Sequence, residues 1–99
     1  MRPRTLLEVA HRTLAGDSFD RCLANFLDAF YLTPGAAMLA DEPPRLALAR
    51  GELGRVQDAY LAATAEELAR VTNLSPPGWI HAEERRLHRP WFASPLAAL

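Results

Sequence analysis

Apolar residues recur at helical spacing along most of this chain. The clearest case follows Asp17 and Ser18, either of which can cap the N-terminus of a helix. After them, six apolar residues fall at i, i+3, i+4, i+7, i+8 and i+11: Phe19, Cys22, Leu23, Phe26, Leu27 and Phe30. This pattern predicts an amphipathic helix with one face buried in a core.

A shorter helix is predicted just before it, from about Leu6 to Ala15. Thr5 and Glu8 have the spacing of a capping box, and Gly16 can adopt the left-handed conformation that ends many helices. Because the link between the two helices is short, we expect an antiparallel or steeply crossed hairpin.

The longest uninterrupted pattern runs from Leu53 to Val71 and consists mostly of good helix formers. Two apolar rows with three-and-four spacing cover this helix. The first is Leu53, Val56, Tyr60 and Ala63, and the second is Leu61, Ala65, Leu68 and then Val71 or Thr72. A helix that is apolar on two sides must be packed on two sides, so we expect it to be the central helix.

Shorter elements are predicted around the long helix. Thr33-Pro34 is expected to open a short helix that ends before Pro43-Pro44. One or two helical turns over 45–50 should precede a bend at 51–54. Residues 73–78 form a turn-rich break, and one or two further turns are expected within 79–87.

The predicted fold is therefore all-α: a small bundle of about four to six helices around one long central helix, with an irregular Trp- and Pro-rich C-terminal tail. The 99 residues are enough for one domain with a modest core. Within that domain, 1–50 holds the hairpin and short helices, 51–73 the central helix, and 74–99 the Trp-, Pro- and Arg-rich tail.

Composition narrows the classes of function. The net charge of −1 argues against nucleic-acid binding by this chain alone, because such proteins usually carry a basic excess. All eleven basic residues are Arg, whose planar guanidinium can pair bidentately with a carboxylate at an interface. The single cysteine excludes an internal disulfide, and no apolar run is long enough for a membrane span. We expect a soluble, cytoplasmic protein.

Candidate catalytic and metal sites find little support. His81-Ala-Glu83 resembles half of a zinc deaminase motif, but no Pro-Cys-x-x-Cys follows it. Cys22 lies on the apolar face of its predicted helix, where a free cysteine usually acts as a small hydrophobe. The adjacent carboxylates of Glu66-Glu67 and of Glu83-Glu84 splay apart on a helix. We therefore expect no enzymatic activity, no metal and no cofactor.

The C-terminal tail concentrates the residue types that dominate protein interfaces. Trp and Arg are enriched in interface hot spots, and the candidate partner-binding residues are Trp79, Arg85, Arg86, Arg89, Trp91 and Phe92. The alternative is that the two tryptophans pin the tail back onto the long helix and complete the core. The two interpretations are compatible.

Four stretches together resemble a family of small actinobacterial antitoxins that are encoded beside nucleotidyltransferase-like toxins. They are FLDAFY (26–31), ADEPP (40–44), DAYLAATAEELAR (58–70) and PPGWIHAEERRLHRPWF (76–92). The most specific part is Pro-x-x-Trp followed by Leu-x-x-Pro-Trp-Phe.

The resemblance implies an antitoxin that binds a cognate nucleotidyltransferase toxin of the MenT type, which modifies tRNA, and neutralises it by direct contact. Trp79, Trp91 and Phe92 would be the aromatic anchors, and Arg85, Arg86 and Arg89 would meet carboxylates of the toxin. Two alternatives remain open: a self-associating adaptor or structural domain that forms a homodimer, and a DNA-binding autorepressor of its own operon.

Overall fold

The computed structural model describes residues 2–86, and within them every regular element is a helix. Four α-helices, α1 (Leu6–Leu14), α2 (Phe19–Leu32), α3 (Ala37–Ala40) and α4 (Ala47–Val71), are followed by two 3₁₀ turns, η1 (Gly78–His81) and η2 (Glu83–Arg85). The prediction of an all-α fold built around one long helix is confirmed.

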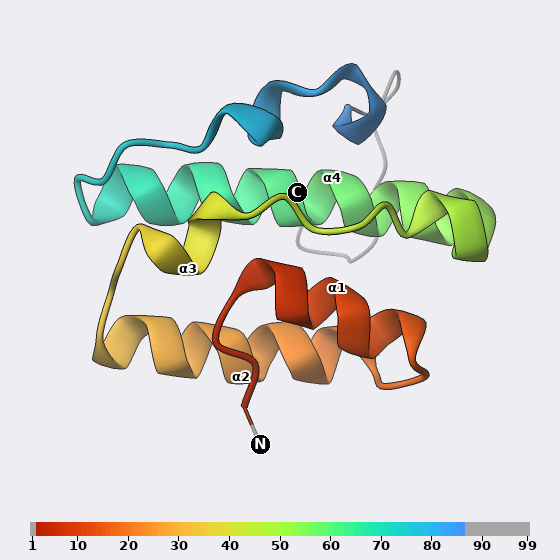
Figure 1. Cartoon of the computed structure of the whole chain (residues 1–99), viewed down its shortest axis with the longest axis horizontal. Coiled ribbons are helices and arrows are strands. Elements are labelled where there is room, and N and C mark those ends of the chain that lie inside the picture. Colours follow the sequence, from red (N-terminus) through yellow and green to blue (C-terminus); the bar gives the residue numbers. More distant parts are fainter. Residues whose placement is uncertain (1, 87–99) are drawn as a thin grey trace, which may run out of the picture.

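The elements form layers around α4 (Figure 1). The α1–α2 hairpin lies on one side of it, with α3 between the hairpin and the C-terminal half of α4. After α4 the chain reverses, and the segment that carries η1 and η2 runs back along the helix. None of the described helices is both long and apolar enough to cross a membrane.

The hairpin forms as the sequence predicts. The Oγ1 of Thr5 accepts a hydrogen bond from the N–H of Glu8 at 3.1 Å, while Glu8 reaches back to the N–H of Arg4 instead of that of Thr5. At the other end, Gly16 has φ +112°, and the N–H of Asp17 bonds to the carbonyl of Arg12 at 3.0 Å. This pattern is a Schellman motif, which stops α1 and turns the chain into α2.

The core lies where the helices face one another. Phe26 and Phe30 of α2 are fully buried, with their ring centroids 6.0 Å apart. Leu6 and Val9 of α1 are also fully buried, as is Leu61 of α4. Burying each of these side chains is worth roughly 1.5–3 kcal/mol of gross stabilisation, so this seam holds the hairpin against the rest.

The long helix contains one break. Gly51 has φ +61° and ψ −134°, which are not helical values, so a first turn over 47–50 is offset from the continuous helix that follows. The predicted bend is thus confirmed at Gly51, whereas Gly54 already lies inside the helix.

Two local predictions were wrong. Thr33 ends α2 as its C-cap, and α3 begins later, after Ala36, without a side-chain cap. The chain leaves α2 in a non-helical conformation at Thr33 (φ −146°, ψ 79°), so Pro34 cannot serve as the first residue of a helix there. The apolar row that begins at Leu53 was also predicted to be buried, yet Leu53 is 51% exposed and Tyr60 is 49% exposed.

Candidate functional site

A buried carboxylate, Asp58, holds the start of α4. Its Oδ1 accepts a hydrogen bond from the backbone N–H of Leu46 at 2.7 Å, and its Oδ2 accepts one from Ala47 at 3.1 Å. The first N–H groups of a helix have no partner within it, and Leu46 at the N-cap offers no side-chain acceptor. Asp58 therefore supplies, from further along the same helix, the cap that the local sequence lacks.

Gly54 makes this arrangement possible. It lies one turn before Asp58, and a Cβ at this position would stand 2.3 Å from the carbonyl oxygen of Leu46. Because no side chain fits there, the first turn of α4 can lie directly against the helix. Gly54 and Asp58 thus act on the same face of α4.

The second buried charge is Arg85 in η2, whose side chain is closed off from solvent. Its Nη1 lies 3.8 Å from Oδ1 of Asp58, and its Nε donates a hydrogen bond to Oε2 of Glu42 at 3.3 Å. Its Nη2 donates to the carbonyl oxygen of Pro43. An unpaired buried cation lowers the stability of the fold by several kcal/mol, so these contacts are strongly favoured. They fix η2 against α4 and against the segment before α4 that contains Glu42 and Pro43.

Trp79 in η1 completes this attachment. The guanidinium of Arg85 lies over the indole ring, 5.0 Å from its centroid, and the indole N–H donates to the carbonyl oxygen of Leu39 at 2.9 Å. A cation over an aromatic face is attracted by the ring quadrupole. Trp79 is therefore engaged within the chain, where it attaches the start of the tail to the body of the protein.

Arg45 and Glu84 surround the buried charges. The Nε of Arg45 lies 3.4 Å from Oδ2 of Asp58, and its Nη1 lies 4.0 Å from Glu84. We call the whole set the Asp58 cluster: Glu42, Arg45, Asp58, Trp79, Glu84 and Arg85. Its members come from three segments far apart in sequence, and it closes one side of α4.

The predicted partner-binding residues therefore have different roles. Arg85 is 2% exposed and already engaged within the chain, so in this structure its guanidinium is not available to a partner. Trp79 is half-buried, whereas Arg86 is exposed. Arg89, Trp91 and Phe92 lie outside the described residues.

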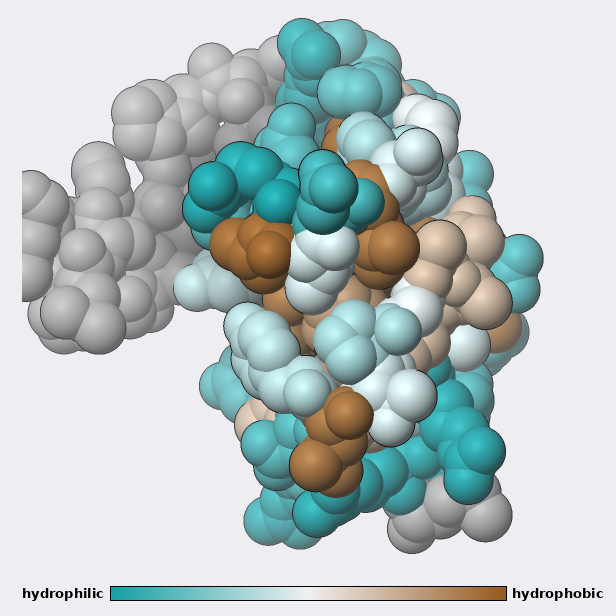
Figure 2. All heavy atoms as spheres, turned by 90° about the vertical axis from the view of Figure 1, so that its left-hand side faces the viewer, coloured by the Kyte–Doolittle hydropathy of each residue, from teal (hydrophilic) through white to brown (hydrophobic). Residues whose placement is uncertain are grey.

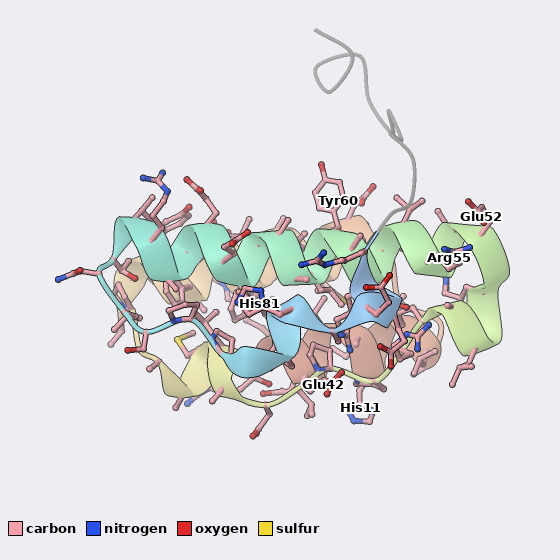
Figure 3. The ribbon with its side chains drawn as sticks, turned by 90° about the horizontal axis from the view of Figure 1, so that it is seen from above. His11, Glu42, Glu52, Arg55, Tyr60 and His81 are labelled. Atoms are coloured by element: carbon pink, nitrogen blue, oxygen red, sulfur yellow. The ribbon has the colours of Figure 1, made fainter. Side chains whose placement is uncertain are left out.

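The described residues cover the other side of α4 less completely. In Figure 3, Tyr60 points away from the side on which Glu42 and His81 lie. A groove of about 580 Å³ lies here between α2 and α4. We call it the α2–α4 groove; its lining residues are Ser18, Phe19, Asp20, Leu23, Arg50, Leu53, Val56, Gln57 and Tyr60.

Gln57 stands out within this groove. It is 8% exposed, and among the described residues its buried Oε1 has no hydrogen-bond donor. Buried polar atoms are nearly always hydrogen-bonded, to protein or to ordered water, so this acceptor is unusual among the described residues. The periodicity of the sequence did not single out Gln57, because this residue belongs to neither of the two apolar rows of the predicted helix.

The candidate catalytic residues are not brought together. Cys22 is buried in the core, while His11 and His81 are exposed on separate elements. Burial raises the pKa of the Cys22 thiol, and the nearby carboxylate of Asp17 raises it further, which makes the thiol a poor nucleophile. Within 2–86, no three His, Cys, Asp or Glu side chains are grouped so that they could hold a metal ion.

Comparisons with protein families, with curated proteins and with solved structures found no match to this chain.

Proposed function

We propose that this chain is a cytoplasmic antitoxin that binds a cognate nucleotidyltransferase toxin and neutralises it by direct protein–protein contact. The chain acts as an inhibitor and carries out no reaction of its own. By mass action, a sub-nanomolar complex leaves almost no free toxin when the inhibitor is in excess.

The observation that carries this proposal is the way in which the segment 78–86 is fixed. Trp79 and Arg85 anchor the segment through buried contacts, so its backbone is already ordered when Arg86 is presented at the surface. An ordered surface loses less conformational entropy on binding than a disordered one, and this favours affinity. The segment also contains Trp79, one residue of the motif in which the resemblance to the antitoxin family is most specific.

We assign different roles to the residues of this region. Arg86, together with Arg89, Trp91 and Phe92 beyond the described residues, is proposed to contact the toxin. Trp79 and Arg85 are proposed to act indirectly, because they hold the segment in place. A nucleotidyltransferase site contains metal-binding carboxylates, and a guanidinium can pair with such carboxylates in a bidentate manner.

A paired expression test examines the function directly. The neighbouring nucleotidyltransferase-like gene is expressed alone and together with this chain, and growth and co-purification are recorded from the same cultures. We expect growth arrest by the neighbour alone and recovery with a co-purifying complex. A harmless neighbour, or two proteins that never associate, would refute the antitoxin function.

The role of the arginines needs variants that do not disturb folding. Arg86→Ala combined with Arg89→Ala should weaken inhibition without changing the unfolding midpoint. Arg70→Ala is a matched control, because Arg70 is an exposed arginine of α4 that pairs with Glu67 at 3.1 Å. Full protection by the double variant would exclude these two residues from the interface.

Self-association is a second candidate function, favoured by one observation. Tyr31 and Leu32 at the end of α2 are 62% and 76% exposed. On the face that carries the C-terminal ends of α2 and α4, however, hydrophobic residues form small separate groups among hydrophilic ones (Figure 2). Light scattering of the isolated chain, compared with Leu32→Asp, tests whether this apolar pair forms a homodimer.

A further inference from the structure

Residues 78–86, which we call the strap, are attached to the four α-helices by side chains. Within the described residues, the backbone-to-backbone hydrogen bonds of the strap stay inside it or reach back to Pro77. Its hydrogen bonds to the rest of the chain come from the indole of Trp79 and the guanidinium of Arg85. A segment that shares no backbone hydrogen bond with the helices can leave them without breaking any helical turn.

The helices keep most of their core when the strap is absent. Of the buried apolar residues that form the core in the described chain, the strap supplies Ile80, and all the others come from α1 to α4 or from the segment just before α4. Trp79 packs against this core while only half-buried itself. Release of the strap therefore exposes much less apolar surface than global unfolding does, so it should require less free energy.

The polar groups beneath the strap also keep partners when it leaves. Asp58 retains the backbone N–H groups of 46–47 and the Nε of Arg45. The Glu42 side chain is 52% exposed, so water can replace Arg85 as its partner. Breaking a buried ion pair is costly when it strands the remaining charge, and release of the strap strands neither carboxylate.

Arg85 gains hydrogen bonds when it leaves its buried position. Its Nη1 lies 3.8 Å from Oδ1 of Asp58, and within the described chain this nitrogen has no hydrogen-bond acceptor. In water the same N–H groups are fully solvated, so part of the desolvation penalty of burial is recovered on release. The buried pair thus holds the strap less firmly than a fully hydrogen-bonded pair would.

We propose that the strap is a releasable element: it detaches from α4 as one unit while α1 to α4 stay folded, and the contacts of Arg85 set how often it does so. Asn73, with φ +59°, ends α4 before the strap begins, and Pro77 is extended, so residues 73–77 form the hinge. Release is a property of the free chain and goes beyond the proposed function. Its consequence, that Arg86 is presented on an ordered backbone only in the docked state, rests on that function.

Trypsin digestion under native conditions measures the release. The guanidinium of Arg85 is buried and cannot enter the protease while the strap is docked, so formation of fragment 1–85, identified by its mass, reports opening. Cleavage after Arg55, inside α4, reports unfolding of the helices in the same digest. With rates normalised to those of the urea-unfolded chain, we expect fragment 1–85 to form about tenfold faster or more. Its rate should also depend less on urea, because release exposes less surface.

Two variants distinguish local release from global unfolding. Arg85→Lys keeps the charge and the trypsin site but loses the planar fork that reaches two acceptors at once. It should speed formation of fragment 1–85 about tenfold, as for the loss of one hydrogen bond of a buried charge. Phe26→Leu is the control, because Phe26 is a core residue of α2, on the other side of α4 from the strap (Figure 1). It weakens the helices whether the strap is docked or released, so it should speed cleavage after Arg55 and leave fragment 1–85 unchanged.

Coupled behaviour of the strap and the helices would overturn the proposal. If fragment 1–85 forms no faster than cleavage after Arg55 and has the same urea dependence, the strap opens only when the whole chain unfolds. Equal acceleration of fragment 1–85 by Arg85→Lys and Phe26→Leu would show the same. Either result leaves the antitoxin function standing, because the digestion uses the free chain, whereas failure to bind the toxin would refute that function without affecting release.

Discussion

The two sides of α4 differ in how completely the chain covers them. On one side, the Asp58 cluster joins three segments and buries two opposite charges, Asp58 and Arg85, at 3.8 Å. On the other side, the α2–α4 groove leaves Leu53 and Tyr60 half exposed. Each side holds one buried polar atom without a hydrogen bond to a described residue, Nη1 of Arg85 on the first and Oε1 of Gln57 on the second. The two sides therefore differ in how much apolar surface the described chain covers, and not in how fully their buried polar atoms are paired.

The closed side also shows that tryptophan and arginine can serve the fold and not only an interface. Tryptophan and arginine are typical of binding hot spots, yet Trp79 and Arg85 are engaged within the chain. The large apolar residues of α4 that remain exposed are Leu48, Leu53, Tyr60 and Val71, which include no tryptophan and no arginine. Interface composition alone therefore does not identify which side of the helix binds a partner.

The largest expected effect comes from breaking the closed side. Asp58→Ala removes the partner of Arg45 and Arg85 and the cap of the first turn of α4. Removal of one member of a buried ion pair costs about 3–5 kcal/mol, so we expect a loss of this size in the free energy of unfolding. Urea denaturation followed by circular dichroism measures it.

Glu52→Ala is the control for this variant, because Glu52 pairs with Arg55 at 3.9 Å on the exposed surface (Figure 3). Exposed ion pairs contribute little to stability, so its denaturation midpoint should stay at the wild-type value. If Asp58→Ala were as mild as this control, the cluster would not be what closes this side of α4.

A smaller loss is expected from Gly54→Ala. The new Cβ would meet the carbonyl group of Leu46, which cannot move away freely because Asp58 holds the N–H of the same residue. Overpacking of this kind costs about 1–3 kcal/mol. Thermal unfolding of the variant should show the loss.

Gly35→Ala is the matched substitution for comparison. A Cβ at position 35 meets no atom within 4 Å, so this variant should be neutral or slightly stabilised. Equal midpoints for the two variants would show that the first turn of α4 does not depend on close approach at Gly54.

The smallest expected effect concerns the pH dependence of Cys22 in α2. Burial holds the pKa of this thiol in the folded chain above the 9.0 of an exposed thiol. Because the folded state then keeps its proton where the unfolded state loses it, stability should fall as the pH rises above about 9. Below that value, this contribution is fully present.

The measurement is the unfolding midpoint between pH 7 and 10 for the wild-type chain and for Cys22→Ala, in which this part of the decline should be absent. Alkylation of the native thiol at neutral pH should also be much slower than in denaturant. Rapid labelling of the folded chain would show that the α2 side is more open than its burial indicates.

The helices of the hairpin could be predicted from sequence because their determinants are local. Thr5, Gly16 and Ser18 act within a few residues of their own positions, and the apolar spacing of α2 matches its buried face. The length of α4 was predictable for the same reason. Periodicity, however, could not show that the row containing Leu53 faces an open groove and not a packed neighbour.

The Asp58 cluster depends on contacts between distant segments, which is why the sequence did not predict it. Asp58 hydrogen-bonds to residues 46 and 47, and Arg85 reaches residues 42 and 43. One signal was present: Gly54, Asp58, Leu61, Ala65 and Leu68 fall on one row with four-and-three spacing, and all five are buried. An aspartate on a core row indicates that a buried cation or helix end lies opposite.

The proposed role of the closed side of α4, in which buried contacts hold a toxin-binding segment in place, is tested most directly by comparing Trp79→Phe with Arg86→Ala. For each variant, the unfolding midpoint and the dissociation constant for the toxin are measured on the same preparation. We predict that Trp79→Phe, which loses the hydrogen bond to Leu39, lowers the midpoint and weakens affinity together. Arg86→Ala should weaken affinity with an unchanged midpoint, because Arg86 is exposed. Unchanged affinity in both variants would contradict this role.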